Sequence, residues 1–305
     1  MLAAHGDSNL GKIAGALSQA LARRERDGVS AATTATGVAS GQGWSVADVI
    51  CTAGPTDRAF EERHGRMSIA ITLAGTFQYR SGRGRALMTP GALLLGNAGE
   101  CFECGHEHAA GDRCIAFRYQ PELFDRIAAD VGLKPNHRRF RTPRLPPTKR
   151  IALVAARAAA GIDAPESLSW EELAVELAAT AVRDSAAATL TTPAVTSSAT
   201  ARVTESVRRI EACPAAPWRL QQLAAEAGQS PYHFLRIFQQ VAGVTPHQFI
   251  LRARLREAAR QLRADDTRVI EIAFSAGFGD LSNFNKSFRA EFGVTPRAWR
   301  GARGR

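Results

Sequence analysis

Apolar and polar positions follow a period of two through the first part of the chain. Between Trp44 and about Tyr119 the apolar residues stand in short or alternating runs, which Gly, Pro or Asn separate. Many short runs with regular turn signals predict a β-sandwich or a small β-barrel. The predicted strands cover residues 44–51, 68–73, 76–79, 86–88, 92–95 and 113–119. The pattern makes five residues candidates for the core: Trp44, Ile69, Ile71, Phe77 and Leu94.

After Pro121 the apolar positions recur at helical spacing instead. This spacing predicts helices over residues 121–131, 147–160 and 169–185. Prolines at positions 143, 146 and 147 separate the first helix from the second, because proline cannot continue a helix. The segment 121–185 is therefore expected to be a helical addition to the barrel.

Two stretches lack a clear period. Residues 11–26 could form a short amphipathic helix, and residues 28–43, which follow it, are rich in Gly, Ala, Ser and Thr. Residues 1–43 are therefore predicted to be a flexible extension of the barrel at 44–120. Residues 186–200 carry no charge and are also rich in Thr, Ser and Ala. This composition is typical of a linker, and we place the domain boundary there.

The last third of the chain, residues 201–305, is helical by pattern and contains one layout twice. Residues 220–238 and 269–288 each consist of a short helix, a turn with Gly and a second helix, and Gly-Val-Thr-Pro follows both copies. The predicted helices cover residues 202–212, 218–227, 230–241, 246–263, 267–276 and 280–291. The repeat predicts two helix-turn-helix units, at about residues 218–241 and 267–291.

The second helix of each unit has one apolar and one polar face. Its phenylalanines, at 234 and 238 and at 284 and 288, should face the core, and Ser230 and Asp280 are good N-caps. The polar face suits base readout, since Arg or Lys pairs with guanine and Asn with adenine. The candidate DNA-binding residues are Tyr232, His233, Leu235, Arg236, Leu281, Ser282, Asn283, Asn285 and Lys286. Seven other arginines are expected to contact phosphates or solvent: Arg252, Arg254, Arg256, Arg260, Arg289, Arg297 and Arg300.

Charge is distributed unevenly between the two parts. The chain has 39 Lys and Arg against 29 Asp and Glu, and residues 201–305 hold 17 of the basic and 9 of the acidic residues. A basic domain beside a nearly neutral one indicates a polyanionic partner. A basic helix on a membrane surface is disfavoured, because the arginines lie on several helices separated by turns. The pattern also fits a plain helical bundle with an arginine-rich surface. A nucleoid-type architectural protein would be basic as well, but the base-reading side chains argue against it.

Three sequence elements follow one another in the second unit. Residues 272–278 read I-A-F-S-A-G-F, residues 284–289 read F-N-K-S-F-R and residues 293–300 read G-V-T-P-R-A-W-R. In this order they resemble the signature of the AraC/XylS family of bacterial transcription regulators, over about residues 202–300. The resemblance implies that the second helix of each unit enters DNA. The positions that match the family's base-reading ones are Tyr232, Leu235, Arg236, Leu281, Ser282 and Lys286.

Residues 44–119 are similar to the cupin-like effector domain that is often found ahead of this family's DNA-binding domain, mainly through L-A-G-T-F at 73–77 and M-T-P-G-A-L-L-L at 88–95. The two resemblances imply the domain plan and the partners. The fold class expected is α+β multidomain, with a cupin-like N-terminal barrel that senses an effector and an all-α double helix-turn-helix. Double-stranded DNA, RNA polymerase, a second copy of the chain and an unidentified small-molecule or metal effector are the implied partners. The helices at 147–185 would form the dimer contact, or would simply cover the sheet.

The cupin resemblance raises the question of a metal site and of enzymatic activity. Cupins that bind metal use a His-x-His and a later histidine, but here the first region has only His64, and Phe102 stands at the later position. A cupin enzyme is therefore disfavoured. A different cluster lies nearby, formed by Cys101, Cys104, His106, His108 and Cys114. It could bind zinc or another thiophilic metal, act as a thiol redox switch, or be structural, and the sequence leaves all three open.

The remaining features concern the cellular setting. Five cysteines are too few and too scattered for a disulfide scaffold, which favours a reducing compartment. No run approaches the ~18 apolar residues of a membrane span, and the N-terminus lacks the pattern of a secretory signal. We therefore expect a cytoplasmic regulator of transcription that contacts no membrane.

Overall fold

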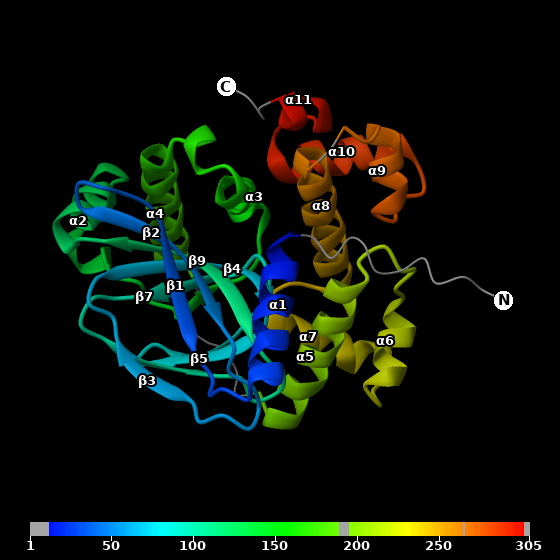
Figure 1. Ribbon diagram of the computed structural model, residues 1–305, viewed down its shortest axis with the longest axis horizontal. Coiled ribbons are helices and arrows are strands. Elements are labelled where there is room, and N and C mark those ends of the chain that lie inside the picture. The colour runs from blue at the N-terminus through cyan, green and yellow to red at the C-terminus, as the bar shows by residue number, and fades with distance from the viewer. Residues whose placement is uncertain (1–11, 189–194, 265, 302–305) are drawn as a thin grey trace.

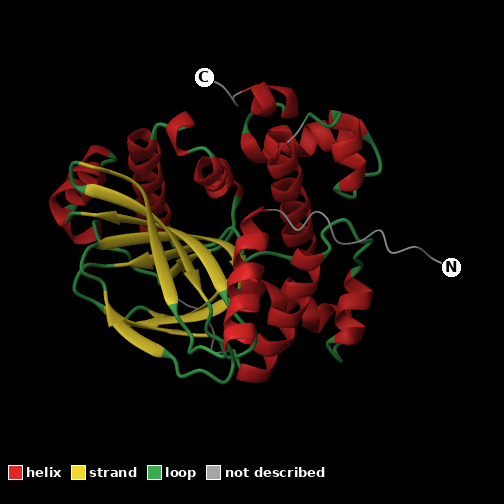
Figure 2. Cartoon of the chain, in the orientation of Figure 1, coloured by secondary structure: helices red, strands yellow, loops and turns green. Residues whose placement is uncertain are grey.

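The computed structural model describes residues 12–188, 195–264 and 266–301. It has a β-rich N-terminal part and a helical C-terminal part that pack against each other (Figure 1). The strands gather in the first part, and helices flank them on the side of α2 and α4 (Figure 2). None of the described helices combines the length and the apolar character that a membrane crossing requires.

The strands form two antiparallel sheets, as expected for a cupin-like domain. The six-stranded sheet has the order β1-β2-β9-β4-β7-β10 and the four-stranded sheet the order β3-β8-β5-β6. The strand bounds are β1 Thr33–Gly41, β2 Trp44–Cys51, β3 Phe60–Arg63, β4 Met67–Gly75, β5 Phe77–Ser81, β6 Gly84–Met88, β7 Leu93–Gly96, β8 Cys101–Gly105, β9 Asp112–Tyr119 and β10 Arg144–Leu145.

The five predicted core residues are all buried, but they belong to two cores, one on each side of the larger sheet. Trp44, Ile69 and Ile71 face the helices, in a core that also holds side chains from α2 and α4. Phe77 and Leu94 pack between the two sheets. This division follows from the strand period of two, which sends alternate residues to opposite faces.

Residues 1–43 are not simply a flexible extension, and this part of the sequence-based prediction was wrong. Within the described portion, α1 Lys12–Asp27 packs on β2, β4 and β9 and buries Leu17. Strand β1 pairs with β2 along its whole length, although most of its side chains are exposed. Backbone hydrogen bonds to a neighbouring strand hold β1 in place, so its polar, Gly-rich sequence resembles that of a loop. Residues 1–11 lie outside the described part.

Three helices cover the outer face of the six-stranded sheet or its edge. Helix α4 is tied to the sheet by the Tyr119 hydroxyl, which donates to the Ala174 carbonyl at 2.8 Å. Covering the sheet is thus one observed use of the segment 147–185. The helices are α2 Pro121–Asp130, α3 Lys149–Asp163 and α4 Trp170–Ala187, with short 3₁₀ turns η1 Pro135–His137 and η2 Pro165–Ser167.

The C-terminal part is wholly helical among its described residues. Its helices are α5 Ser197–Ala212, α6 Leu220–Glu226, α7 Pro231–Ala242, α8 Pro246–Ala264, α9 Val269–Ser275, α10 Leu281–Phe292 and α11 Pro296–Gly301. Helix α5 begins inside the predicted linker, where the Thr196 hydroxyl accepts a hydrogen bond from the Ala199 amide. Ser and Thr suit helix N-termini as well as linkers, which explains the misplaced boundary. Helix α4 likewise runs into the predicted linker, to Ala187, and residues 189–194 lie outside the described part.

The two parts meet along three elements of the N-terminal part. Helix α3 contacts α8 and α10, and strand β6 contacts α7. Arg144, in β10, bridges the parts because its Nη1 donates to the carbonyls of Leu87 at 2.7 Å and Val241 at 2.6 Å. Burial lowers the pKa of this guanidinium to about 10. The N-terminal part therefore contacts both helix-turn-helix units.

Candidate nucleic-acid interface

The first helix-turn-helix unit consists of α6, a short turn and α7. Gly228 adopts a φ of 64° in the turn, a conformation that glycine takes at little cost. The Ser230 hydroxyl accepts a hydrogen bond from the His233 amide at 3.3 Å and so caps α7. Phe234 and Phe238 are fully buried and fix the helix against its own core. The opposite face is left open.

The second unit repeats this construction with α9 and α10. Gly277 has a φ of 86°, and an Asp280 carboxylate oxygen accepts from the Asn283 amide at 2.7 Å. Phe284 and Phe288 are fully buried, four residues apart as in α7. Both units thus present a capped, rigid second helix.

The predicted base-reading residues lie on the open faces of α7 and α10. Tyr232 is 71% exposed, an unusual setting for a large aromatic side chain in a chain without a bound partner. Two of the nine candidate residues are leucines, and both are half-buried. A leucine side chain forms no hydrogen bond, so on a base edge it can contact only the methyl group of thymine. The exposed ones are Tyr232, His233, Arg236, Ser282, Asn283, Asn285 and Lys286, and the half-buried ones are Leu235 and Leu281.

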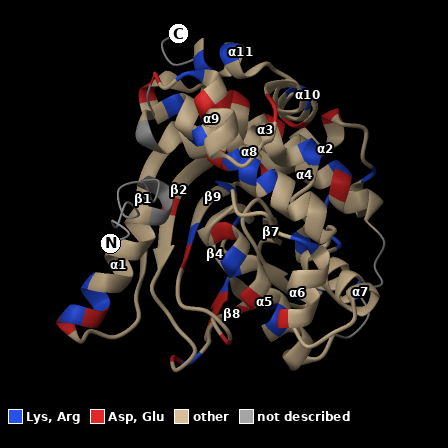
Figure 3. Ribbon diagram, turned by 90° about the vertical axis from the view of Figure 1, so that its right-hand side faces the viewer, with Lys and Arg blue, Asp and Glu red and all other residues tan. Residues whose placement is uncertain are grey.

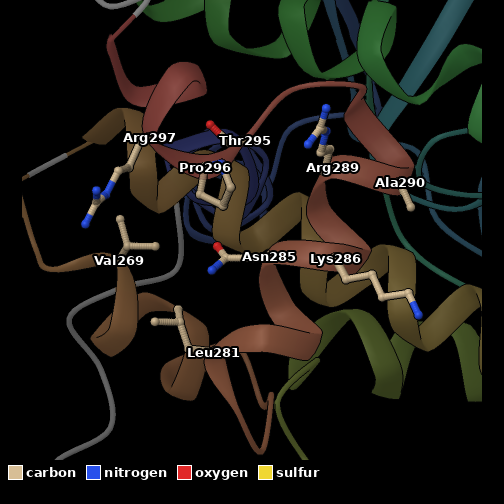
Figure 4. A pocket seen from close by; sticks show the side chains of 9 residues that line it. All are labelled: Val269, Leu281, Asn285, Lys286, Arg289, Ala290, Thr295, Pro296 and Arg297. Atoms are coloured by element: carbon tan, nitrogen blue, oxygen red, sulfur yellow. The ribbon is translucent and has the colours of Figure 1, made fainter.

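An open depression of about 840 Å³ lies beside α10, bounded by α9 and α11 (Figure 4). Asn285 and Lys286 come from α10 and Leu281 lies at its start, so three predicted base-reading residues line it. Arg289 and Arg297 stand at its rim and are exposed. A depression with amide, ammonium and guanidinium groups offers donors for base edges and for phosphates.

Three arginines of α8 that were expected to contact phosphates or solvent have carboxylate partners within the protein. Arginines recur along this helix (blue in Figure 3), and its one acidic residue is Glu257. Arg252 pairs with Glu291 at 2.8 Å, Arg256 with Glu211 at 2.5 Å and Arg260 with Glu257 at 2.6 Å. The partners of Arg252 and Arg256 lie on other helices and depend on tertiary contacts that the linear sequence does not show, whereas Arg260 and Glu257 form an i, i+3 pair within α8. Arg300 likewise donates to the Thr267 carbonyl at 2.5 Å.

Arg254 has a structural role that sequence reasoning missed. Its guanidinium donates at 2.9 Å to three carbonyls, those of Pro214, Ala216 and Gly277. The first two belong to the loop before α6, and the third to the turn of the second unit. Burial lowers the pKa of Arg254. One side chain on α8 thus fixes the second unit's turn relative to the first unit.

The predicted cysteine–histidine cluster is divided between the two faces of β8. Cys101 and Cys104 are three residues apart, and because side chains alternate along a strand, they point in opposite directions. Cys101 is exposed, whereas Cys104 and Cys114 are buried between the sheets. His106 is buried and His108 lies nearer the surface, where its Nε2 is 3.8 Å from Glu107.

Among the described residues, one group of three side chains of the kinds that bind metals lies close together, and this group differs from the cluster predicted from the sequence. It comprises Cys51, His106 and Asp112. Only His106 belongs to the cluster expected from the sequence. Burial raises the pKa of the Cys104 and Cys114 thiols well above the ordinary range, which disfavours the reactive thiolates that a redox switch needs.

His64 and Phe102, the two residues compared above with the metal-binding histidines of cupins, pack against each other. His64 is stacked on Phe102, with ring centroids 4.1 Å apart, and its Nε2 lies 2.8 Å from the Tyr79 hydroxyl. Burial lowers the pKa of His64 to about 4, so the imidazole is neutral at physiological pH. Its arrangement is that of a satisfied core histidine.

Comparisons with known proteins agree with this architecture. Residues 48–182 match the model of the AraC-like ligand binding domain, and residues 223–302 match that of a helix-turn-helix domain. The "probable transcription factor PqrA" of Proteus vulgaris is 32% identical over 82 residues, which make up 27% of this chain and 67% of PqrA. The HTH-type transcriptional activator RhaS of Salmonella agona is 30% identical over 166 residues, 54% of this chain and 58% of RhaS.

One solved structure that is similar to this chain contains DNA. The DNA-binding domain of AdpA, a global transcriptional factor crystallised with a target DNA, is 30% identical, with a TM-score of 0.32, over 33% of this chain and 91% of that chain. The chain spans about a third of the length of the first curated relatives it matches. The two family models and the match to PqrA identify it: the chain belongs to the AraC family of transcription regulators, with an AraC-like ligand-binding domain followed by a DNA-binding helix-turn-helix region.

Proposed function

We propose that the protein is a sequence-specific regulator that reads two adjacent half-sites on one face of duplex DNA. The observation that carries this proposal is the pair of capped second helices, α7 and α10, whose phenylalanines are buried and whose polar faces are open. Two such helices can enter successive major grooves about 34 Å apart. Helix α8 and the Arg254 contacts hold the units in one arrangement, which would fix the spacing of the half-sites.

The exposed side chains divide into two roles. Arg236 on α7 and Asn285 and Lys286 on α10 are the best candidates for hydrogen bonds to base edges, since guanine and adenine present matching acceptors and donors in the major groove. Arg289 and Arg297, at the rim of the depression, are placed for phosphate contacts that position the domain without reading sequence.

The sensor would act through its contacts with both units. Arg144 links strand β6 to the C-terminal end of α7, and α3 packs against α8 and α10. An effector bound in the N-terminal domain would shift the population of arrangements of this interface. The shift would change occupancy of paired half-sites, or contact with RNA polymerase, in a homodimer or a monomer.

The proposal is tested by measuring affinity for a selected operator and for operators with single base substitutions. Arg236→Ala should lose ~1–3 kcal/mol at one operator position and little at the others. Lys286→Ala should do the same at a position in the other half-site. Arg183→Ala, an exposed arginine on α4 of the sensor, is the matched control and should leave binding unchanged.

Two outcomes would count against this assignment. Uniform weakening of Arg236→Ala on every sequence would make that residue a phosphate contact. Equal affinity of the unmodified protein for all sequences would favour an architectural DNA-binding protein instead.

A further inference from the structure

Three metal-ligating side chains meet at one end of the barrel. Cys51 is the last residue of β2 and Asp112 the first of β9, and they lie directly opposite each other in the strand register. His106 follows β8 and reaches the same place. One donor atom from each of the three lies within 4.8 Å of the others, and none of these residues is more than 5% exposed.

The histidine in this cluster faces the carboxylate. Its Nε2 lies 2.8 Å from Oδ1 of Asp112, and its Nδ1 is buried with no hydrogen-bond partner among the described residues. Because the two ring nitrogens point away from each other, a cation shared with Asp112 would bind at Nε2 in place of this hydrogen bond, and Nδ1 would carry the proton. The three donor atoms lie close enough together for one ion to reach them all.

None of the described contacts of the Asp112 carboxylate is an arginine. Its two oxygens contact the His106 ring and the Cys114 thiol, the latter at 3.2 Å from Oδ2. The next residue, Arg113, is directed to Asp48 instead, at 2.8 Å. A carboxylate that is 5% exposed needs a compensating charge, which a divalent cation would supply.

We propose that Cys51, His106 and Asp112 form a binding site for one thiophilic divalent cation, with zinc as the best match. Sulfur, nitrogen and carboxylate oxygen are the donors that zinc takes, and its tetrahedral ligands lie roughly 3.5 Å apart. The three donors are near enough to reach that spacing with small shifts. Water would take the fourth position. On binding, the Cys51 thiol gives up its proton to solvent and the thiolate forms the bond to the metal.

Helix α1 covers this end of the barrel. Gly111, next to Asp112, lies against Leu17 of α1, and Arg24 donates to the Thr52 carbonyl beside Cys51 at 2.5 Å. The cover would retain the ion and would have to open for exchange. Because the readout is metal per chain, a test of this site is independent of whether the protein binds DNA as proposed.

The site is tested on the full-length chain, purified under reducing and anaerobic conditions and incubated with Zn²⁺ or Co²⁺ before desalting. We expect about one metal per chain by elemental mass spectrometry. The cobalt form should show the charge-transfer absorption of a thiolate ligand. Cys51→Ser should remove this band, and Asp112→Asn, which keeps the side-chain shape, should weaken cobalt binding at least ~10-fold. Cys101→Ser, an exposed thiol on the other face of β8, is the control and should bind like the unmodified chain.

Three results would overturn the proposal. The first is the absence of a thiolate–cobalt band in the unmodified chain. The second is a band that survives in Cys51→Ser but disappears in Cys101→Ser, which would place the metal at the Cys-x-x-Cys pair. The third is unchanged cobalt affinity in Asp112→Asn. This variant alone tests the site if circular dichroism shows that Cys51→Ser does not fold.

Discussion

The two helix-turn-helix units carry a matched pair of glycines that differ in their surroundings. Gly228 and Gly277 occupy the corresponding turn positions and both have positive φ, 64° and 86°. A Cβ atom at Gly228 would have no neighbour within 4 Å. At Gly277 it would stand 2.8 Å from both Cα and the carbonyl oxygen of Ala215, and 3.1 Å from Nε of Arg254. An alanine would therefore be held in an unfavourable backbone conformation at both positions, but it would clash with neighbouring atoms only at position 277.

The expected losses follow from these contacts. Holding alanine in the left-handed region costs about 1 kcal/mol, which is the whole expected effect of Gly228→Ala on the free energy of unfolding. Gly277→Ala must in addition displace backbone atoms of the loop before α6, and overpacking of this kind costs about 1–3 kcal/mol. We expect a total of about 2–4 kcal/mol for Gly277→Ala, together with weakening of the Arg254 contacts that join the two units.

The comparison is made by urea unfolding of both variants beside the parent chain, followed by operator binding under conditions where all three are folded. Gly277→Ala should be the less stable variant and should lose affinity for a two-half-site operator. Gly228→Ala should bind close to normally. Equal losses of stability would refute the reasoning, because they would show that the Ala215 loop yields freely to a side chain at position 277.

Three further changes probe other parts of the structure. Arg144→Met removes two hydrogen bonds between the N-terminal part and the DNA-binding part and should lower the free energy of unfolding by about 2–4 kcal/mol. In calorimetry the single unfolding transition should separate into two. Arg150→Met is the control and should have almost no effect, because its arginine forms an ion pair while 78% exposed. Unfolded His64 takes up a proton below its ordinary pKa of 6.5, while the folded imidazole stays neutral to about pH 4. Stability should therefore fall as the pH drops through this window, by up to about 3 kcal/mol in urea unfolding, and His64→Gln should remove this dependence. Asp280→Ala removes the N-cap of α10 and should cost about 1 kcal/mol of thermal stability, which Asp280→Ser should restore.

Local signals predicted the DNA-binding part well. The duplicated layout, the caps at Ser230 and Asp280 and the phenylalanines four residues apart depend on positions within one helix or turn. The sequence therefore carries them directly. The partners of Arg252 and Arg254 lie about 40 residues away in the chain, and no periodic pattern specifies them.

The N-terminal part was harder to predict for two separate reasons. Strand β1 is held by pairing with β2 rather than by buried side chains, so its residues give no alternating pattern. The cysteine–histidine cluster was proposed from spacing in sequence, without the strand period. Alternation along β8 separates Cys101 from Cys104, and this could have been foreseen once β8 was recognised as a strand. The contribution of Cys51, about 60 residues away from Asp112 in the chain, required the sheet register.

The central claim is that the two units read two half-sites together, and in vitro selection of binding sites tests it most directly. The full-length chain is incubated with random duplexes, and the bound sequences are compared with those selected by Arg236→Ala and Lys286→Ala. The account predicts a bipartite site with its halves about 10 base pairs apart, in which each variant loses preference in a different half. A single short site, or loss of preference in the same half for both variants, would contradict it.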